Sequence, residues 1–448
     1  MDELLGSAAT RAMRYLREIQ DRPVAPTAEA VARLAVLREP FPEGPGEPGD
    51  VLALLDEVGS PATMGMAGPR FFGFVIGGAL PAALAANWLA SAWDQNAAFD
   101  SPAPAVSVLE SVALEWMCEI FGLPAGSAGA FVTGATMANF SALAAARHAV
   151  LAGQGWDVEA DGLFGAPPIT VVIGEEAHPT LIKALGLVGF GRNRLVRVPV
   201  DRQGRMRADA LPPLSPATIV CAQAGNVNTG AFDPLVALAE GTRAAGAWLH
   251  VDGAFGLWAT AASGRAHLAD GVGLADSWAT DGHKWLNVPY DSGLAFVRDA
   301  GALRAAMAVT ADYLPSEPGV RNPSDSTPEL SRRARGVDVW AALRSLGRSG
   351  LDDLIERNCR QASRFAEGLS AAGYEILNDV VLNQVLVSFG EPPETRRVVA
   401  GVQDDGTCWC GGTVWQGRTA MRISVCSWAT TDDDVERSLE AILRIAQG

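Results

Sequence analysis

Two stretches near the middle of the chain, WLHVDGA at residues 248–254 and DSWATDGHKW at residues 276–285, decide the fold. Each begins as a short apolar run, typical of a β-strand, and ends in charged or small residues. Asp252 closes the first run, and His283 and Lys284 follow the second. The spacing between the runs leaves room for one helix, as in neighbouring parallel strands, whose C-terminal ends form one edge of a sheet. We therefore expect Asp252 and Lys284 at that edge.

Apolar runs alternate with helical segments on both sides of these stretches. This alternation predicts an α/β fold with a mainly parallel central sheet that helices cover on both faces. Two helices are expected before the sheet, at residues 80–93 and 106–121. The expected strands cover residues 169–173, 195–200, 218–222, 248–251, 276–280 and 293–297.

The domain organisation follows from changes in pattern along the chain. Residues 1–75 are helical, interrupted by prolines and poor in core of their own, so we expect an arm that packs on another surface, such as a second subunit. Residues 76–305 hold the sheet. Residues 306–335 include a Pro- and Ser-rich stretch without periodicity, which indicates a mobile loop. Residues 336–448 are expected to form a small α+β unit, with strands near 381–389 and 420–426 and a last helix at 432–447.

Composition excludes several classes of protein. The 448 residues carry 35 Lys+Arg and 51 Asp+Glu, and a net charge of −16 offers no basic surface for nucleic acid. The N-terminal segment lacks an apolar signal-peptide core, and no apolar stretch is long enough to span a bilayer, so we expect a cytoplasmic protein without a membrane partner. Six scattered cysteines without a nearby His favour thiols over disulfides and predict no metal site.

The chain has only two lysines, Lys183 and Lys284. A lone lysine is usually a solvated surface residue, and Lys183, within a helical run, fits that description. Lys284 instead follows a strand and lies between His283 and Trp285. A lysine that is shielded from water in such a setting is suited to forming an imine. Any amine chemistry of this protein is therefore expected at Lys284.

Two other segments complete a set of candidate site residues. Residues 129–139 form an apolar run that meets Thr133-Gly134-Ala135 at the start of an Ala-rich helix, where hydroxyls cap the helix or its N–H groups bind a phosphate. His178 follows another strand, as a loop residue or a site residue, and Asp252 either caps a turn or pairs with a cationic ring. One cofactor, pyridoxal 5′-phosphate (PLP), requires a phosphate cradle, a His, an Asp and a Lys together.

These residues resemble the group II PLP-dependent amino-acid decarboxylases, which include aromatic-amino-acid, glutamate and 2,4-diaminobutyrate decarboxylases. The resemblance runs from about Gly68 to the C-terminus and is most specific in the HVDGA and HKW motifs. It implies the fold type I, aspartate-aminotransferase-like architecture and a homodimer with active sites at the subunit interface and an exchanged N-terminal arm. The motifs are GPRFFGF (68–74), SPAPAVSVLE (101–110), TGATMANFSALAAAR (133–147), GAFDPL (230–235), WLHVDGAFG (248–256), ADSWATDGHKWLNVP (275–289) and MRISVCS (421–427).

The resemblance also implies roles for single residues. Lys284 matches the Schiff-base lysine, Asp252 the partner of the pyridine nitrogen, and His178 the histidine that stacks on the ring, which makes Lys284 and His178 the catalytic candidates. The remaining cofactor contacts implied are Thr133, Gly134, Ala135 and His283 near the phosphate and Ala254 on the ring face. The candidate substrate contacts are Phe71, Phe72, Asn96, Tyr313 and Arg422.

The chain departs from the family pattern at three places. Asp281 stands where many members have Asn, which puts an acid near the expected phosphate. Residues 224–229, AGNVNT, replace a Thr-rich run. Well-known members carry a loop Tyr that is thought to protonate the substrate carbon, whereas residues 322–327 contain no Tyr and leave Tyr313 as the loop candidate.

The expected activity is the decarboxylation of an L-amino acid to an amine and CO2. Without the loop Tyr, an alternative is an aldehyde product, by decarboxylation coupled to oxidative deamination or to transamination. Other carbon–carbon lyase or aminotransferase chemistry on the same fold is a further alternative. A cofactor-free binding protein is disfavoured because the cofactor residues are intact. Phe71 and Phe72 suit an aromatic substrate, whereas Asp94, Gln95 and Asn96 are polar, so the substrate side chain stays open.

Overall fold

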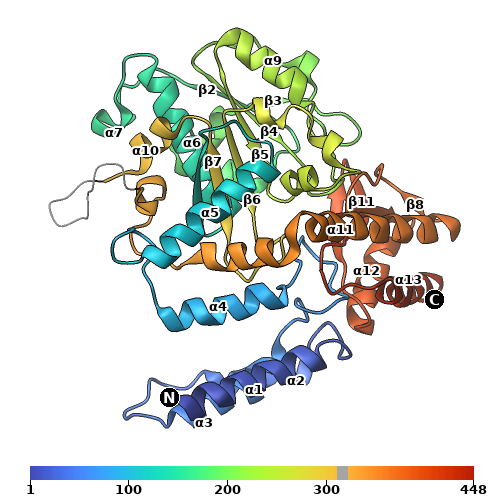
Figure 1. Cartoon of the computed structure of the whole chain (residues 1–448). Helices are drawn as coiled ribbons and strands as arrows, with labels where there is room; N and C mark the ends of the chain where they lie inside the picture. The colour runs from blue at the N-terminus through green and yellow to red at the C-terminus, as the bar shows by residue number, and fades with distance from the viewer. Residues whose placement is uncertain (310–320) are drawn as a thin grey trace. The chain divides into compact units, whose positions relative to one another are not determined.

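The computed structural model describes residues 1–309 and 321–448 (Figure 1). Tyr313, a predicted substrate contact, lies outside the described residues. The contacts within the chain define two compact units, and the division into four parts stays a prediction. The large unit comprises Ala79–Arg360 and Asn378–Gln384, and the small unit comprises Met1–Gly78, Gln361–Leu377 and Val385–Gly448.

A seven-stranded sheet forms the centre of the large unit, in the order β1-β7-β6-β5-β4-β2-β3. Strand β7 runs antiparallel to both of its neighbours, and the other neighbouring pairs are parallel. The predicted α/β fold with a mainly parallel sheet is therefore confirmed. The strands are β1 (Ala128–Val132), β2 (Thr170–Gly174), β3 (Val196–Val198), β4 (Thr218–Gln223), β5 (Trp248–Asp252), β6 (Ser277–Asp281) and β7 (Gly293–Val297).

Helices surround this sheet (Figure 1). Proline occupies an early position in α4, α5 and α8, where its missing N–H has no partner to lose. Helix α11 is interrupted by the positive φ of Gly347, and its residues after Arg360 belong to the small unit. The helices are α4 (Pro81–Trp93), α5 (Pro104–Ile120), α6 (Ala135–Ala152), α7 (Val158–Asp161), α8 (Pro179–Leu187), α9 (Leu235–Ala245), α10 (Ala300–Met307) and α11 (Arg335–Ala371).

Helix α6 packs against one face of the sheet, and this face carries the polar residues of interest. Leu143 and Ala146 of α6 contact alternate residues of β2 and β4, and Ala138 contacts Ala279 of β6. Because successive strand residues point to opposite faces, every second residue faces α6. On β5 these are His250 and Asp252, and on β6 they are Ser277, Ala279 and Asp281.

The small unit contains a four-stranded sheet in the order β10-β11-β9-β8. The strands predicted near 381–389 and 420–426 and the last helix are confirmed, whereas β8 and β10 were not predicted. Buried Arg70 donates to the carbonyls of Thr407 and Gln20, at 2.7 and 2.8 Å, and to Asp434, at 3.2 Å. The elements are α1 (Asp2–Glu18), α2 (Ala28–Arg33), α3 (Pro48–Leu54), β8 (Glu375–Ile376), β9 (Gln384–Ser388), α12 (Pro392–Asp405), β10 (Gly411–Trp415), β11 (Arg418–Ser424) and α13 (Asp432–Gln447).

Membrane-spanning helices and disulfides can be assessed only for the residues that the structure describes. Within them, no helix combines the length and apolar character that crossing a bilayer requires. None of the cysteines there takes part in a disulfide, as the sequence predicted.

A buried ion pair attaches the residues that precede α11 to the large unit. Nη2 of Arg332 lies 2.8 Å from Oε2 of Glu110 on α5, and both side chains are at most 1% exposed. The same guanidinium donates to the carbonyls of Ala97 and Phe131, at 2.8 and 3.1 Å. The C-terminal part of the predicted loop 306–335 is thus fixed against α5 and the end of β1.

We expect Glu110→Ala to lower the free energy of unfolding by about 3 kcal/mol or more, because it leaves the Arg332 charge buried without its partner. Glu119→Ala, on the same helix, is the matched control. Glu119 pairs with Arg348 at the surface, where both side chains are about two-thirds exposed, so this change should cost about 1 kcal/mol or less. Urea unfolding of the two variants measures the difference, and equal losses would contradict the assignment.

Candidate active site

Four segments of the large unit bring charged and polar groups to the C-terminal edge of the parallel strands. Asp252 ends β5, Asp281 ends β6, and Lys284 lies three residues beyond it. The Oδ1 atom of Asp281 accepts a hydrogen bond from the N–H of Ala135, at 2.6 Å, and its Oδ2 lies 3.2 Å from Nζ of Lys284. The end of β6, the start of α6 and the lysine therefore meet at one point. The acid that departs from the family pattern makes this connection.

Asp252 is 3% exposed and is held from two sides. Its Oδ1 accepts the N–H of Ala254 and its Oδ2 accepts Nδ2 of Asn139, both at 3.2 Å. Burial raises the pKa of Asp252, while the charges of His178 and Lys284 act in the opposite direction. His178 and Lys284 therefore lie close enough for their charges to act on the Asp252 carboxyl. The structure thus brings the three main predicted residues together.

The two histidines of the predicted site are fixed by local contacts. His178 caps the N-terminus of α8: its Nδ1 accepts the N–H of Thr180 at 3.3 Å and lies 2.6 Å from the Thr180 hydroxyl. His283 accepts the N–H of Ser292 at 3.2 Å, and its ring stacks on Tyr290 at 4.3 Å between centroids. Burial lowers the pKa of His283, and the Asp281 charge partly offsets this. Both rings therefore have defined orientations.

The start of α6, which the sequence predicts to be an anion cradle, packs closely against β7. Gly134 precedes the helix, and the backbone of Gly293 at the start of β7 lies against it, so close that a Cβ on Gly293 would lie 2.3 Å from the Gly134 Cα. The first turn of a helix has N–H groups that the helix itself does not pair, and its dipole favours an anion. Asp281 accepts the N–H of Ala135, and half-buried Thr133 directly precedes Gly134.

These groups fit PLP. The Lys284 amine matches the cofactor's aldehyde, the Asp252 carboxyl its pyridine nitrogen, the His178 ring its flat face, and the α6 start its phosphate. The match rests on the chemistry of the donors and on their convergence in one unit of the protein. Two observations support the match. Lys284 forms an ion pair with Asp281, and the charges of His178 and Lys284 act on Asp252.

The predicted substrate residues are placed differently. Phe71 and Phe72 are buried in the small unit, where Phe71 stacks on Trp409 and Phe72 meets Phe365 edge to face, each at 5.1 Å between centroids. Arg422 lies on β11 of the same unit, and burial lowers its pKa. Asn96 accepts the N–H of Arg332 at 3.0 Å in the large unit. Substrate contact by these residues stays a prediction.

Several residues near the site were missed by sequence reasoning. Asn139 and His250 lie inside the motifs at 133–147 and 248–256, but the sequence pattern assigns a role to neither. The signal that could have found His250 is its position two residues before Asp252, which puts both on the same face of β5. Ser277 and Tyr290 join the set only through tertiary contacts, with His250 and with His283.

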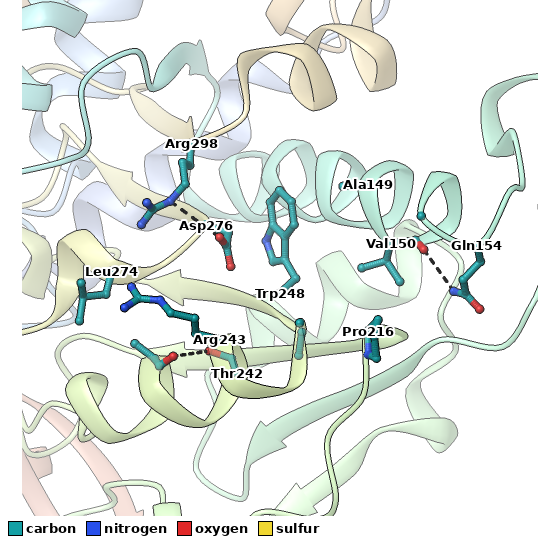
Figure 2. Close-up of a pocket in the computed structure, with 14 residues that line it drawn as sticks. Ala149, Val150, Gln154, Pro216, Thr242, Arg243, Trp248, Leu274, Asp276 and Arg298 are labelled. Atoms are coloured by element: carbon teal, nitrogen blue, oxygen red, sulfur yellow. Dashed lines mark hydrogen bonds and ion pairs between the residues drawn. The ribbon is translucent and has the colours of Figure 1, made fainter.

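A separate pocket of about 410 Å³ lies at the opposite edge of the sheet (Figure 2). Trp248 at the start of β5, Asp276 just before β6 and Arg298 just after antiparallel β7 line it. It contains none of the predicted site residues.

Comparison with known proteins gives a consistent result. The sequence profile of the "Pyridoxal-dependent decarboxylase conserved domain" matches residues 51–390. The chain is 28% identical over 472 aligned residues to tryptophan decarboxylase 1 of Oryza sativa subsp. japonica, covering 96% of this chain and 90% of that protein. It is 30% identical to L-2,4-diaminobutyrate decarboxylase of Rhizobium meliloti (strain 1021), covering 90% and 83%. The crystal structure of Oryza sativa TDC with PLP and tryptamine matches the fold with a TM-score of 0.91, at 23% identity, over 100% of this chain and 97% of that one.

The Asp281 contact yields one prediction. Asp281→Ala removes the acceptor of the Ala135 N–H and the partner of Lys284, and we expect the free energy of unfolding to fall by about 1–2 kcal/mol, as for a lost helix cap. Asp281→Asn keeps an oxygen acceptor and should lose less. Chemical denaturation of the cofactor-free protein measures both, and a larger loss in the Asn variant would contradict the capping role.

A second prediction concerns acid. His250 is fully buried, and burial lowers its pKa from 6.5 to about 3. Between these two pKa values the imidazole is protonated in the unfolded chain and neutral in the folded chain. The free energy of unfolding therefore falls as the pH drops below 6.5 toward 3. His250→Gln cannot titrate and should weaken this dependence by about 1.4 kcal/mol per pH unit. Unfolding curves across that range provide the measurement, and identical slopes would refute the assignment.

Proposed function

The chain belongs to the pyridoxal-dependent decarboxylase family, and from this premise we propose the residues with which it acts as a PLP-dependent carboxy-lyase. The enzyme releases CO2 from an L-amino acid and leaves an amine. One observation supports our assignment of the site to the edge near β5 and β6. There Lys284, the candidate imine-forming residue of a two-lysine chain, lies 3.2 Å from Asp281 and faces buried Asp252.

PLP supplies a ring that accepts the electron pair left when CO2 departs. Lys284 would hold the cofactor's aldehyde carbon through its amine, and Asp252 would hold the proton on the pyridine nitrogen. His178 would lie on the ring, with Ala254 on the ring face. The start of α6, with Thr133, Gly134 and His283, would bind the phosphate, and Ala135 would lie beside it with its N–H on Asp281.

Asp281 would act as a fixed anchor. Its carboxylate holds the first N–H of α6 and pairs with the Lys284 ammonium. With Lys284 bonded to the cofactor, Asp281 would keep its hydrogen bond to Ala135 and would so hold the helix start in place. We therefore assign Asp281 a positioning role for the phosphate cradle, although it carries a negative charge.

An aldehyde product is the second candidate function. Residues 322–327 contain no Tyr, and Asn322, Ser324, Ser326 and Thr327 are buried around a short 3-10 helix (Pro323–Ser326). This stretch therefore offers no phenol to the substrate carbon. An amino-acid panel, with CO2, amine and aldehyde measured together, decides between the products and identifies the substrate. Amine equal to CO2 supports the main proposal, and aldehyde in its place supports the second.

The assembly we propose is a cytoplasmic homodimer in amino-acid metabolism. Helices α1, α2 and α3 bury none of their residues within the chain. Large apolar side chains there are exposed, including Leu5, Met13, Val31, Val51 and Leu54. Such a surface needs a partner, and a second copy of the arm would supply it. Light scattering should give twice the chain mass, and removal of the arm residues should lower it; a full-length monomer would refute the dimer.

The two lysines allow a matched test of the site. Lys284→Ala should abolish the visible absorption band of lysine-bound PLP and lower decarboxylation by about 1000-fold or more, because the covalent anchor is lost. Lys183→Ala, at an exposed position of α8, should leave the band and the activity as they are. A normal absorption band in the Lys284 variant would contradict the assignment of Lys284. A lost band in the Lys183 variant would indicate that Lys183 binds the cofactor.

A further inference from the structure

Four buried or half-buried side chains form a series of hydrogen bonds that ends at Asp252. Nε1 of Trp248 lies 2.9 Å from Oγ of Ser277, and the same Oγ lies 2.9 Å from Nδ1 of His250. Nε2 of His250 lies 2.7 Å from Oδ1 of Asn139, whose Nδ2 lies 3.2 Å from Oδ2 of Asp252. Ser277, His250 and Asn139 are fully buried. The contacts form one continuous chain along β5, from its first residue to its last.

The two ends of the chain fix the direction of every hydrogen bond in it. An indole N–H can only donate, and an ionised carboxylate can only accept. Trp248 therefore donates to Ser277, whose hydroxyl donates to Nδ1 of His250. The imidazole then carries its proton on Nε2 and donates to Asn139, whose amide donates to Asp252. Only one arrangement satisfies all members while Asp252 is ionised.

A proton on Oδ2 of Asp252 would make this oxygen a weaker acceptor for the Asn139 N–H. A proton on Oδ2 that is directed at Asn139 would reverse the order of the chain. Asn139 would have to turn its oxygen toward the acid, His250 would have to move its proton to Nδ1, and Ser277 would receive two donors. The Ser277 hydroxyl proton would then lose its acceptor in this chain. Leaving a buried polar hydrogen unpaired is costly, so the chain opposes protonation at Oδ2.

We propose that Trp248, Ser277, His250 and Asn139 are positioning residues that keep Asp252 a hydrogen-bond acceptor toward the pyridine nitrogen of PLP. The proposal deepens the function proposed above and rests on it. Oδ1 of Asp252 already accepts the N–H of Ala254, so the chain fixes the second oxygen as well. The carboxylate then presents its remaining lone pairs in one orientation.

The surroundings of Asp252 explain why such support is needed. Burial favours the neutral acid and raises its pKa. The titratable groups that face it are His178, Lys284 and the buried thiol of Cys221 on β4. On bonding the cofactor, the Lys284 amine would become an imine nitrogen, so the cation that acts on Asp252 in the cofactor-free protein would change. The hydrogen-bond chain does not depend on Lys284 and remains.

The outer end of the chain can be altered without touching the site. Trp248 lines the pocket at the opposite edge, and Figure 2 shows its ring between α6 and the strands. Trp248→Phe removes the terminal donor, and Ser277→Ala removes the link that receives it. Neither residue belongs to the proposed cofactor or substrate contacts.

The test compares the binding of PLP with that of its deaza analogue, in which carbon replaces the pyridine nitrogen. Both carry the aldehyde and the phosphate, so the ratio of their dissociation constants isolates the contact between Asp252 and the ring nitrogen. Wild type should prefer PLP. We expect Ser277→Ala and His250→Leu to reduce this preference by about tenfold, and Trp248→Phe by less, through weaker binding of PLP alone. His250→Gln, which keeps an N–H donor, should retain most of it.

Ser141→Ala is the matched control, because it removes a buried hydroxyl from α6 that donates to the Met137 carbonyl and lies outside the hydrogen-bond chain. It should leave the preference unchanged. The proposal is overturned if PLP and its analogue weaken equally in the Ser277 and His250 variants, or if neither weakens. If His250→Leu does not fold, Ser277→Ala and Trp248→Phe decide the matter. Failure of wild type to bind PLP at all would instead overturn the proposed function.

Discussion

Helix α6 lies so close to the central sheet that Asn139 reaches both His250 and Asp252 of β5. This distance is possible because the helix turns small side chains toward the strands, among them Ala138, Ala142 and Ala145, each fully buried. The helix start is held by a β6 residue, since Asp281 accepts the N–H of Ala135. The proposed phosphate cradle, the proposed partner of the pyridine nitrogen and Lys284 therefore depend on the packing of this helix against the sheet.

The sequence was sufficient to predict the strands of the large sheet other than β1, and to predict that Asp252 and Lys284 lie at or just beyond strand ends. Apolar runs that end in Asp252 or precede Lys284 are local signals, and both residues lie where these signals placed them. The hydrogen-bond chain could not be predicted in this way, because Asn139 and Ser277 meet His250 only after the chain has folded. The small unit shows the same limit, since β8 is two residues long and carries almost no pattern.

The scarcity of lysine shapes the electrostatics of the protein. Structural ion pairing falls to arginines, as with buried Arg332 on Glu110 and Arg70 on Asp434. A guanidinium holds two acceptors at fixed angles and stays charged, which suits a buried anchor. The role proposed for Lys284 instead requires a cation that can give up its proton, which an arginine cannot do. The division of labour between the two residue types is part of how this acidic chain supports amine chemistry.

The contact between Gly134 and Gly293 has a consequence for attempts to change the enzyme's specificity. Backbone meets backbone there, and a Cβ on Gly293 would overlap the Gly134 Cα. No repacking of neighbouring side chains can relieve such an overlap, because no side chain causes it. A mutant library that randomises Gly293 would consist largely of misfolded proteins, whereas exposed Gln95 and Asn96 have no such restriction. The diversity available to laboratory evolution therefore lies away from the floor of the phosphate cradle.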